Sequence, residues 1–307
     1  MLVDNEFLYN CVHEKFVDLN YLLKPNITMF YSTATHIILA ETDPDADIYN
    51  TRKYPFFFLA QAKFVNKLIA APIEQFMKLS ERVGLPKCTT SWMFHTTRCG
   101  STALAQALHT LPNFTVISEN QFICRHLTEV ALSGRNADDY ISSPEFTQLL
   151  SICINFMFKD FGENDQVCFK TPGSWAYQPL LPLLASRYPQ HHIIAIHRDG
   201  KGTVESFWNG LTNRGRQLFN GFIKLSYLTG ILKSMNSRLI CLISSGAVRD
   251  LSRFDMLFTV YMMWTTNLRY FVKYGKEVKK LLPLVYDDLQ RDRPAVISQV
   301  TLQLSSS

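Results

Sequence analysis

From residue 89 onward, short apolar runs alternate along the chain with segments of helical periodicity. The apolar runs have the length and composition of buried strands and cover residues 91–95, 114–117, 167–169, 192–197 and 284–286. The helical segments cover residues 102–111, 122–133, 143–158, 179–188, 204–211, 218–232 and 254–274. Strands that alternate with helices predict a parallel sheet whose two faces are covered by helices. We therefore predict an α/β fold for this part of the chain.

The first 88 residues have a different pattern. Ile27–Glu41 is rich in β-branched and aromatic residues with partial alternation, which favours strands. Asp43–Asp47 is a polar turn, and an apolar stripe over Pro72–Val83 predicts a helix. The chain therefore divides into a small N-terminal extension of unknown role, residues 1–88, and an α/β domain, residues 89–307.

Composition narrows the classes of function. The chain has 307 residues, of which 47% are apolar and 19% charged, as in an ordinary globular protein. Its net charge of +5 suits an anionic ligand, but the longest basic runs are pairs such as Lys279-Lys280, which disfavours nucleic-acid binding. The cysteines are scattered without a CxxC pair, so we expect reduced core thiols and no metal site. These are Cys11, Cys88, Cys99, Cys124, Cys153, Cys168 and Cys241.

The sharpest chemical signal is the segment Phe94–Thr102, which reads FHTTRCGST and lies between a predicted strand and a predicted helix. Backbone N–H groups in such a turn, with a helix N-terminus behind them, form an anion site. Gly100 allows a phosphate to approach the main chain closely, and Arg98 adds a permanent, forked cation. Ser101 and Thr102 can cap the helix and donate hydroxyls to a phosphate. The alternative is a helix cap with an incidental arginine.

This segment departs from the phosphate loop of nucleotide hydrolases, GxxxxGK[ST]. His95 replaces the first glycine, and Ser101 replaces the lysine that reaches the β- and γ-phosphates. Ordinary use of ATP or GTP is therefore disfavoured. A nucleotide or small-molecule kinase on the same core stays an alternative.

Arg98-Cys99-Gly100-Ser101-Thr102 resembles the 5′-phosphosulfate-binding loop of the membrane-type sulfotransferases, the carbohydrate and tyrosylprotein enzymes, which usually carry RSGST or RSGTT. The resemblance implies a three-layer, P-loop-like α/β fold with a central parallel sheet flanked by helices. It also implies that the sulfate donor 3′-phosphoadenosine 5′-phosphosulfate (PAPS) is the co-substrate. Cys99 stands where the family has serine, a change that the backbone cradle should survive.

A second block matches the family's 3′-phosphate site, an arginine at a strand end with a serine eight residues later. Arg198 and Ser206 have this spacing, with Gly200 where proline is usual. Eight residues span about two helical turns, so the intervening loop decides whether both side chains reach one phosphate. Ser206 by itself would be interpreted as a solvated helix residue.

Two further blocks follow in the family's order. Val167–Pro172 resembles a strand end whose lysine, here Lys170, stabilises charge near the transferred sulfonate. Without that context, Lys170 is equally a surface lysine at a strand exit. Tyr286–Leu289 resembles a late structural segment. The resemblance covers about residues 90–292. Relatives continue with another helix, which implies a truncated C-terminus.

The resemblance also implies a mechanism. Glu119 falls where tyrosylprotein sulfotransferases carry a catalytic base and would take the proton of the acceptor hydroxyl, although a surface carboxylate is the simpler interpretation. Lys170 and Arg98 would stabilise charge on the sulfonate oxygens, so no metal is required. His95 is a competing base because it lies beside the loop. We expect three other histidines to be structural or at the surface: His126, His191 and His192.

The acceptor is not legible in the sequence, which leaves a glycan, a tyrosine, a small alcohol or an amine open. Arg214 and Arg216 are candidates for further donor contacts. A third hypothesis is a non-catalytic protein that keeps the sulfotransferase fold and acts in binding.

The expected location is cytoplasmic, because no signal peptide and no apolar run of ~18–20 residues is present. The Golgi, where the resembling enzymes reside, is the alternative if the N-terminus is incomplete. Asn26-Ile-Thr28 and Asn113-Phe-Thr115 are formal glycosylation sequons, but we expect Asn113 to lie in the core.

Overall fold

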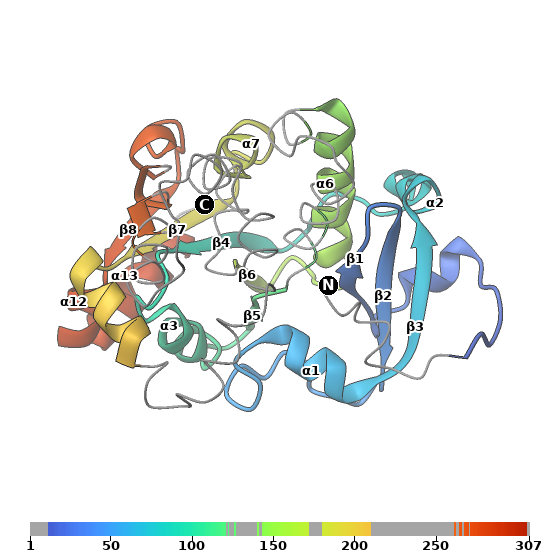
Figure 1. Cartoon of the computed structure of the whole chain (residues 1–307), viewed down its shortest axis with the longest axis horizontal. Helices are drawn as coiled ribbons and strands as arrows, with labels where there is room; N and C mark the ends of the chain where they lie inside the picture. The colour runs from blue at the N-terminus through green and yellow to red at the C-terminus, as the bar shows by residue number, and fades with distance from the viewer. Residues whose placement is uncertain are drawn as a thin grey trace, which may run out of the picture.

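The structure is a computed structural model. It describes residues 12–120, 143–171, 180–209 and 271–305, together with Phe122, His126, Tyr140, Tyr261, Trp264, Thr265 and residues 267–269. Two sheets dominate it, a parallel sheet and a smaller antiparallel one formed by the N-terminal residues (Figure 1).

The parallel sheet has five strands in the order β5-β6-β4-β7-β8. They are β4 (Thr89–His95), β5 (Phe114–Ser118), β6 (Gln166–Lys170), β7 (His192–His197) and β8 (Leu281–Val285). Every pairing is parallel. Each strand overlaps a predicted one, and β8 begins three residues before its predicted start. The predicted α/β fold with a central parallel sheet is confirmed.

Helices cover both faces of this sheet. They are α3 (Ser101–Leu108), α6 (Pro144–Met157), α7 (Leu180–Arg187), α12 (Tyr286–Arg291) and α13 (Arg293–Ser305), and residues 200–209 are also helical. Alternation along β4 sends Trp92 and Phe94 into one core cluster with α6 and α7, and Met93 into another with α3, α12 and α13. Because side chains alternate across a strand, the three layers follow from these apolar runs.

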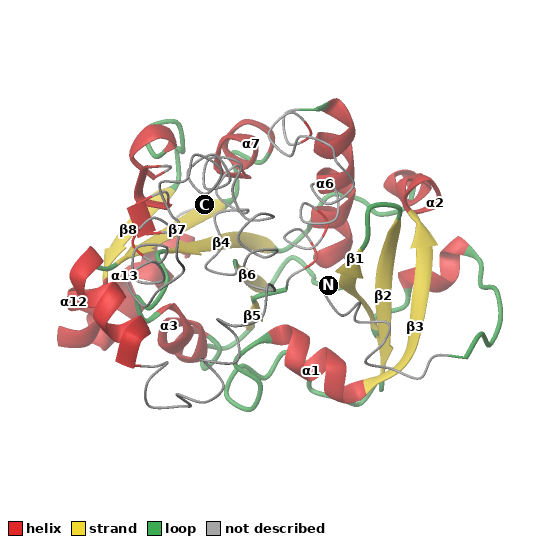
Figure 2. Ribbon diagram, in the orientation of Figure 1, coloured by secondary structure: helices red, strands yellow, loops and turns green. Residues whose placement is uncertain are grey.

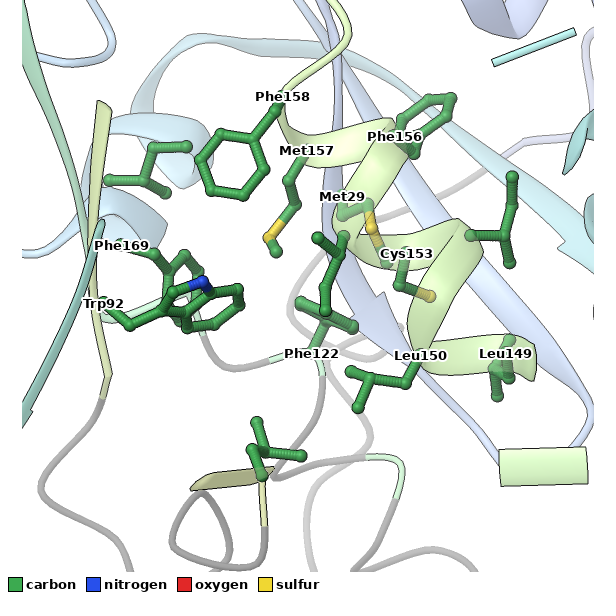
Figure 3. Close-up of a cluster of buried hydrophobic side chains, with 14 of the residues drawn as sticks. Met29, Trp92, Phe122, Leu149, Leu150, Cys153, Phe156, Met157, Phe158 and Phe169 are labelled. Carbon is green, nitrogen blue, oxygen red and sulfur yellow. The ribbon is translucent and has the colours of Figure 1, made fainter. Parts of the chain in front are cut away.

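The first core cluster is aromatic at its centre (Figure 3). The rings of Trp92 and Phe169, on neighbouring strands β4 and β6, have centroids 4.8 Å apart. Phe158 meets Trp92 edge-on, and Cys153 of α6 lies in the same cluster. Met29 of the N-terminal region also belongs to it. The N-terminal residues therefore pack into the same core as the α/β sheet.

The antiparallel sheet has the order β1-β2-β3. Its elements, with the short helices around it, are η2 (Leu19–Leu23), β1 (Ile27–Ser32), β2 (His36–Thr42), α1 (Phe57–Phe64), β3 (Val65–Pro72), α2 (Ile73–Met77) and η3 (Lys78–Glu81). The strands predicted within Ile27–Glu41 and the turn at Asp43 are confirmed, whereas β3 was not predicted. The helix predicted over Pro72–Val83 is shorter than expected, because the chain tightens to a 3₁₀ turn after Met77.

Helix α13 was also not predicted. Val296, Val300 and Leu304 recur at intervals of four residues and are buried against β8 and α3, a helical pattern that the sequence does contain. A helix therefore does follow Asp292. The helices predicted over residues 122–133 and 218–232 fall wholly or mainly outside the described residues.

Two expectations about single residues have clear outcomes. Asn113 was wrongly placed in the core: it is exposed, in the turn before β5, with a positive φ of 56°. Four cysteines are buried and unpaired, as expected for core thiols: Cys88, Cys99, Cys153 and Cys168. The other three lie outside the described residues.

Within the described part of the chain, no helix combines the length and the apolar character needed to cross a bilayer. No group of three or more His, Cys, Asp or Glu side chains there is arranged to hold a metal ion.

Candidate active site

The predicted site residues lie together at one edge of the parallel sheet. Glu119 directly follows β5, Lys170 ends β6, and Arg198 directly follows β7. The loop at residues 96–100 follows β4, the strand whose neighbours in the sheet are β6 and β7. In parallel sheets, ligands bind outside the carboxyl ends of the strands where the strand order reverses. The order β5-β6-β4-β7-β8 places that point at β4.

The loop after β4 turns sharply into α3. Arg98 has a φ of 62° and Gly100 a φ of 78°, so both residues have left-handed backbone conformations. Gly100 is the N-cap residue of α3, and no side chain caps the helix there. The first N–H groups of α3, together with the turn before it, therefore have the arrangement of an anion site.

Cys99 does not face this anion site. Its side chain is fully buried in the second core cluster, where burial raises the pKa of the thiol to about 11. Any contact between a ligand and this position would therefore come from the backbone N–H. Ser101 is buried and Thr102 half-buried at the start of α3, where the sequence placed them.

Gly100 is held from behind by α12. A Cβ at this position would lie 3.0 Å from Leu289 Cδ2 and 3.2 Å from the ring of Tyr286. The segment Tyr286–Leu289, expected to be structural, therefore packs directly against the loop after β4.

Gly100→Ala is expected to lower the free energy of unfolding by roughly 1–3 kcal/mol, because the new Cβ combines a positive φ with crowding against Leu289. Gly84→Ala is the matched control, since a Cβ there would meet nothing within 4 Å. Urea unfolding of both variants checks this expectation. Equal stabilities of the two variants would contradict it.

The two blocks predicted to hold the donor meet in the structure. Arg98 Nε donates to Ser206 Oγ at 3.1 Å, across 108 positions of sequence. Arg198 donates from a terminal guanidinium nitrogen to the backbone oxygen of Arg98 at 3.2 Å. The backbone N–H of Arg198 donates to Thr96 Oγ1 at 3.0 Å. Arg198 and Ser206 therefore both reach the loop after β4.

Arg198 is also held by aromatic residues. Its guanidinium lies 4.2 Å from the ring centroid of Tyr286, a cation–π contact, and its backbone oxygen accepts from Trp264 Nε1 at 2.7 Å. Its Nε is buried and has no hydrogen-bond partner among the described residues. A buried donor without a partner is costly, so a nearby anionic ligand would stabilise this arrangement.

Asp199 shapes the helix that carries Ser206. Its Oδ1 accepts from the backbone N–H of Gly202 at 2.7 Å, and its backbone oxygen accepts from Thr203 N–H at 3.0 Å. The helix over residues 200–209 therefore starts directly after Asp199, which brings Ser206 back toward the loop.

Glu119 and Lys170 form an ion pair between Oε1 and Nζ. The backbone also joins them, since Glu119 N–H donates to the oxygen of Lys170 at 2.8 Å. Glu119 has a φ of 57°, so it leaves the sheet through a left-handed turn immediately after β5. The Lys170 side chain is 0% exposed and that of Glu119 is 18% exposed. The carboxylate is therefore the accessible member of the pair.

His95 is buried at the end of β4. Its Nε2 lies 2.8 Å from the backbone oxygen of Thr171, which can only accept, so Nε2 carries the proton. Burial, with Lys170 nearby, lowers its pKa to about 3. His95 is thus a neutral residue that ties the end of β4 to the end of β6, an environment that argues against it as the base.

The buried neutral histidine is expected to make the fold sensitive to acid. An unfolded histidine takes up a proton near pH 6.5, whereas folded His95 does so near pH 3. Between these pH values the unfolded chain binds more protons than the folded one. The contribution of neutral His95 to the stability of the fold is therefore complete above about pH 6.5 and is lost as the pH falls. The free energy of unfolding should drop between pH 7.5 and 5.5, and by about 1 kcal/mol less in His95→Gln. Urea unfolding at both pH values measures this; equal drops would contradict it.

The three other histidines discussed in the sequence analysis, His126, His191 and His192, are buried rather than at the surface. His191 accepts a hydrogen bond from Trp92 Nε1 at 3.0 Å, and burial lowers its pKa to about 3. His192 is buried on β7, with its pKa lowered to about 4 by the same cause. His126 is buried against Ser32 and the hydroxyl of Tyr140.

Comparison with solved structures finds a similar fold. The chain is similar to the sulfotransferase from Alicyclobacillus acidocaldarius, with 12% sequence identity and a TM-score of 0.42, over 71% of this chain and 81% of that one. No family model and no curated protein matches the chain. At this level of similarity the case for function rests on the residues of the site.

The structure adds contacts that the sequence did not indicate. The ring of Phe56, just before α1, lies 5.6 Å from Lys170 Nζ. Thr96 and Tyr286 hold Arg198, as described above. Thr96 lies inside the predicted loop and Tyr286 inside a resembling block, so both were within reach of sequence reasoning. Phe56 lies in the N-terminal region, outside any motif. Arg214 and Arg216 lie outside the described residues.

Proposed function

We propose that this protein is a sulfotransferase that transfers a sulfonate group from PAPS to a hydroxyl or amine of an acceptor. The observation that carries the proposal is the meeting of Arg98, Ser206 and Arg198 beside a helix N-terminus. Glu119 and Lys170 lie at the ends of the adjacent strands. Anion-binding groups and a general base thus share one edge of the sheet.

The residues of the site fit a donor with phosphates at both ends of its ribose. The loop after β4 and the N-terminus of α3 would take the 5′-phosphosulfate through backbone N–H groups, Ser101 and Thr102. Arg198 and Ser206 would take the 3′-phosphate. The buried Nε of Arg198, which no described residue pairs, suits such a group. Arg98 belongs to the loop and contacts Ser206, so it can donate hydrogen bonds to either phosphate group.

PAPS supplies the sulfonate, whose bond to the bridging oxygen breaks as the acceptor oxygen forms a new bond to sulfur. Glu119 would accept the proton that the acceptor hydroxyl loses, as its partial exposure allows. Lys170 and Arg98 would hold negative charge on the bridging and peripheral oxygens. Lys170 pairs with Glu119 in this structure, so binding of the acceptor would exchange this ion pair for contacts to the reacting groups.

A kinase on the same core is disfavoured by position 101. A phosphate-loop lysine there would reach the β- and γ-phosphates, whereas the residue present is Ser101, buried at the first turn of α3. The cation within the loop's turn is instead Arg98, which points to Ser206. In this proposal, phosphate recognition therefore extends toward β7, where Arg198 would hold the 3′-phosphate of PAPS.

Calorimetric titration with 3′-phosphoadenosine 5′-phosphate (PAP), the spent donor, tests this proposal. We expect micromolar affinity, about −8 kcal/mol, with no binding of AMP, which lacks the second phosphate. A folded protein that fails to bind PAP would overturn the proposal. Tighter binding of ATP-Mg²⁺ than of PAP would identify a kinase. PAP binding without sulfonate transfer to any of the proposed acceptor classes would leave a non-catalytic protein with this fold.

A further inference from the structure

Residues 51–58 of the N-terminal region, which lead into α1, lie beside the candidate site. Figures 1 and 2 show α1 between the antiparallel sheet and the end of the parallel sheet near α3 and β5. Gln106 of α3 donates to the backbone oxygen of Thr51 at 3.2 Å. Ser118, the last residue of β5, donates to the backbone oxygen of Pro55 at 2.7 Å. The segment is therefore fixed to the two elements that flank the phosphate loop and Glu119.

Two aromatic rings lie at the end of this segment. Phe56 lies over Lys170, with its ring centroid 5.6 Å from Nζ. Its ring is parallel to that of Phe58, with an interplanar angle of 3° and centroids 5.9 Å apart. Both residues are half-buried, so part of each is open to solvent. Together Phe56 and Phe58 make an aromatic wall. Its first ring, Phe56, contacts Lys170, the residue that pairs with Glu119.

On the basis of the function proposed above, we infer that this aromatic wall is the acceptor subsite, and that the acceptor carries its hydroxyl next to an aromatic ring. The acceptor oxygen has to lie within about 3 Å of the Glu119 carboxylate. Lys170 Nζ contacts both the Glu119 carboxylate and the Phe56 ring, so Phe56 is the aromatic ring nearest to where the body of such an acceptor would lie. Offset stacking on the pair of rings would fix the orientation of its hydroxyl.

The chemistry of the wall separates the classes of acceptor. The side chains of Phe56 and Phe58 have no hydrogen-bonding atoms, so they favour the binding of apolar and aromatic groups. A glycan can lay one face on an aromatic ring, but its remaining hydroxyls lose water there without gaining partners. The wall therefore favours an aromatic alcohol or phenol over a sugar.

Two matched acceptors test this inference: 2-naphthylmethanol and its fully saturated analogue, which present the same primary alcohol on an aromatic or an aliphatic body. N-acetylglucosamine is the sugar probe. Transfer of radiolabelled sulfonate from PAPS gives kcat and KM for each. We expect kcat/KM for the naphthyl compound to exceed that for the other two by about tenfold or more.

Phe58→Ala is the informative variant, because Phe58 belongs to the wall while Phe56 is the ring over Lys170. It should raise KM for 2-naphthylmethanol by about tenfold, leave kcat within about threefold and leave PAP affinity unchanged, and Phe58→Trp should restore KM. Leu59→Ala, a 43% exposed neighbour on α1, is the control and should change none of these.

The outcomes separate the two proposals. PAP binding together with equal or better use of the saturated alcohol or the sugar would overturn the aromatic subsite and leave the transferase intact. An unchanged KM in Phe58→Ala would do the same. Failure of the wild-type protein to bind PAP would overturn the transferase, and the inference would fall with it.

Discussion

Glu119→Gln is expected to lower kcat for sulfonate transfer by roughly 10²–10⁴-fold, the usual contribution of a general base. The amide keeps an oxygen that can accept from Lys170, so the contact between β5 and β6 should survive. Because Gln cannot take up a proton at neutral pH, the chemical step should suffer. Steady-state rates with PAPS and a working acceptor measure the loss.

The controls separate chemistry from folding and binding. PAP affinity of Glu119→Gln should match that of the wild type, whereas its thermal midpoint should fall, because the buried ammonium of Lys170 loses its charged partner. Glu163→Gln removes an exposed carboxylate from the turn before β6 and should retain full activity. Full activity of Glu119→Gln would show that the base has been misassigned.

The backbone at Glu119 shows why its placement matters. Three residues other than glycine have a positive φ in the described chain, and two of them, Arg98 and Glu119, are site residues. Left-handed conformations cost a non-glycine residue roughly 1 kcal/mol or more, so they persist where the surroundings require them. At Glu119 the turn lets a residue directly after a buried strand present its carboxylate to Lys170 on the next strand.

The sequence predicted the parallel sheet well because each buried strand appears as a short run of apolar residues. The centres of β4 and β7, Trp92–Phe94 and Ile193–Ile196, are continuous apolar runs, which require cover on both faces of the sheet. Strand β3 was missed because Asn66 and Lys67 interrupt its apolar pattern, as suits an edge strand with exposed positions. Helix α13 was missed although Val296, Val300 and Leu304 record its buried face.

The residues of the candidate site were likewise predicted only in part. The loop Arg98–Thr102 is contiguous, so its chemistry was readable from spacing alone. The link from Arg98 to Ser206 joins residues 108 positions apart, and neither periodicity nor the resemblance predicted it, since the resemblance paired Ser206 with Arg198. The contact between Phe56 and Lys170 left no local trace, because it depends on how the N-terminal region packs on the ends of β5 and β6.

Arg198→Ala is expected to weaken PAP binding by roughly 10- to 150-fold, because a charge-assisted hydrogen bond contributes about 1.5–3 kcal/mol. Arg98→Ala should cause a loss of similar size. Since the two residues contact each other, the losses in the double variant should not add. Arg198→Lys should recover only part of the affinity, because lysine cannot offer two parallel N–H groups or stack as well on Tyr286.

Lys201→Ala is the matched control for these arginine variants. Lys201 belongs to the same helical segment as Ser206, is 85% exposed and pairs with Glu205 on the surface. Its removal takes one positive charge from the region without touching the site, so PAP affinity should stay within about twofold at about 0.15 M salt, where exposed charges are largely screened. Calorimetric titration of the four single variants and the double variant gives the comparison. If Lys201→Ala weakens binding as much as Arg198→Ala, general positive charge attracts the ligand. If only the arginine variants lose affinity, a built 3′-phosphate site at Arg198 accounts for the binding.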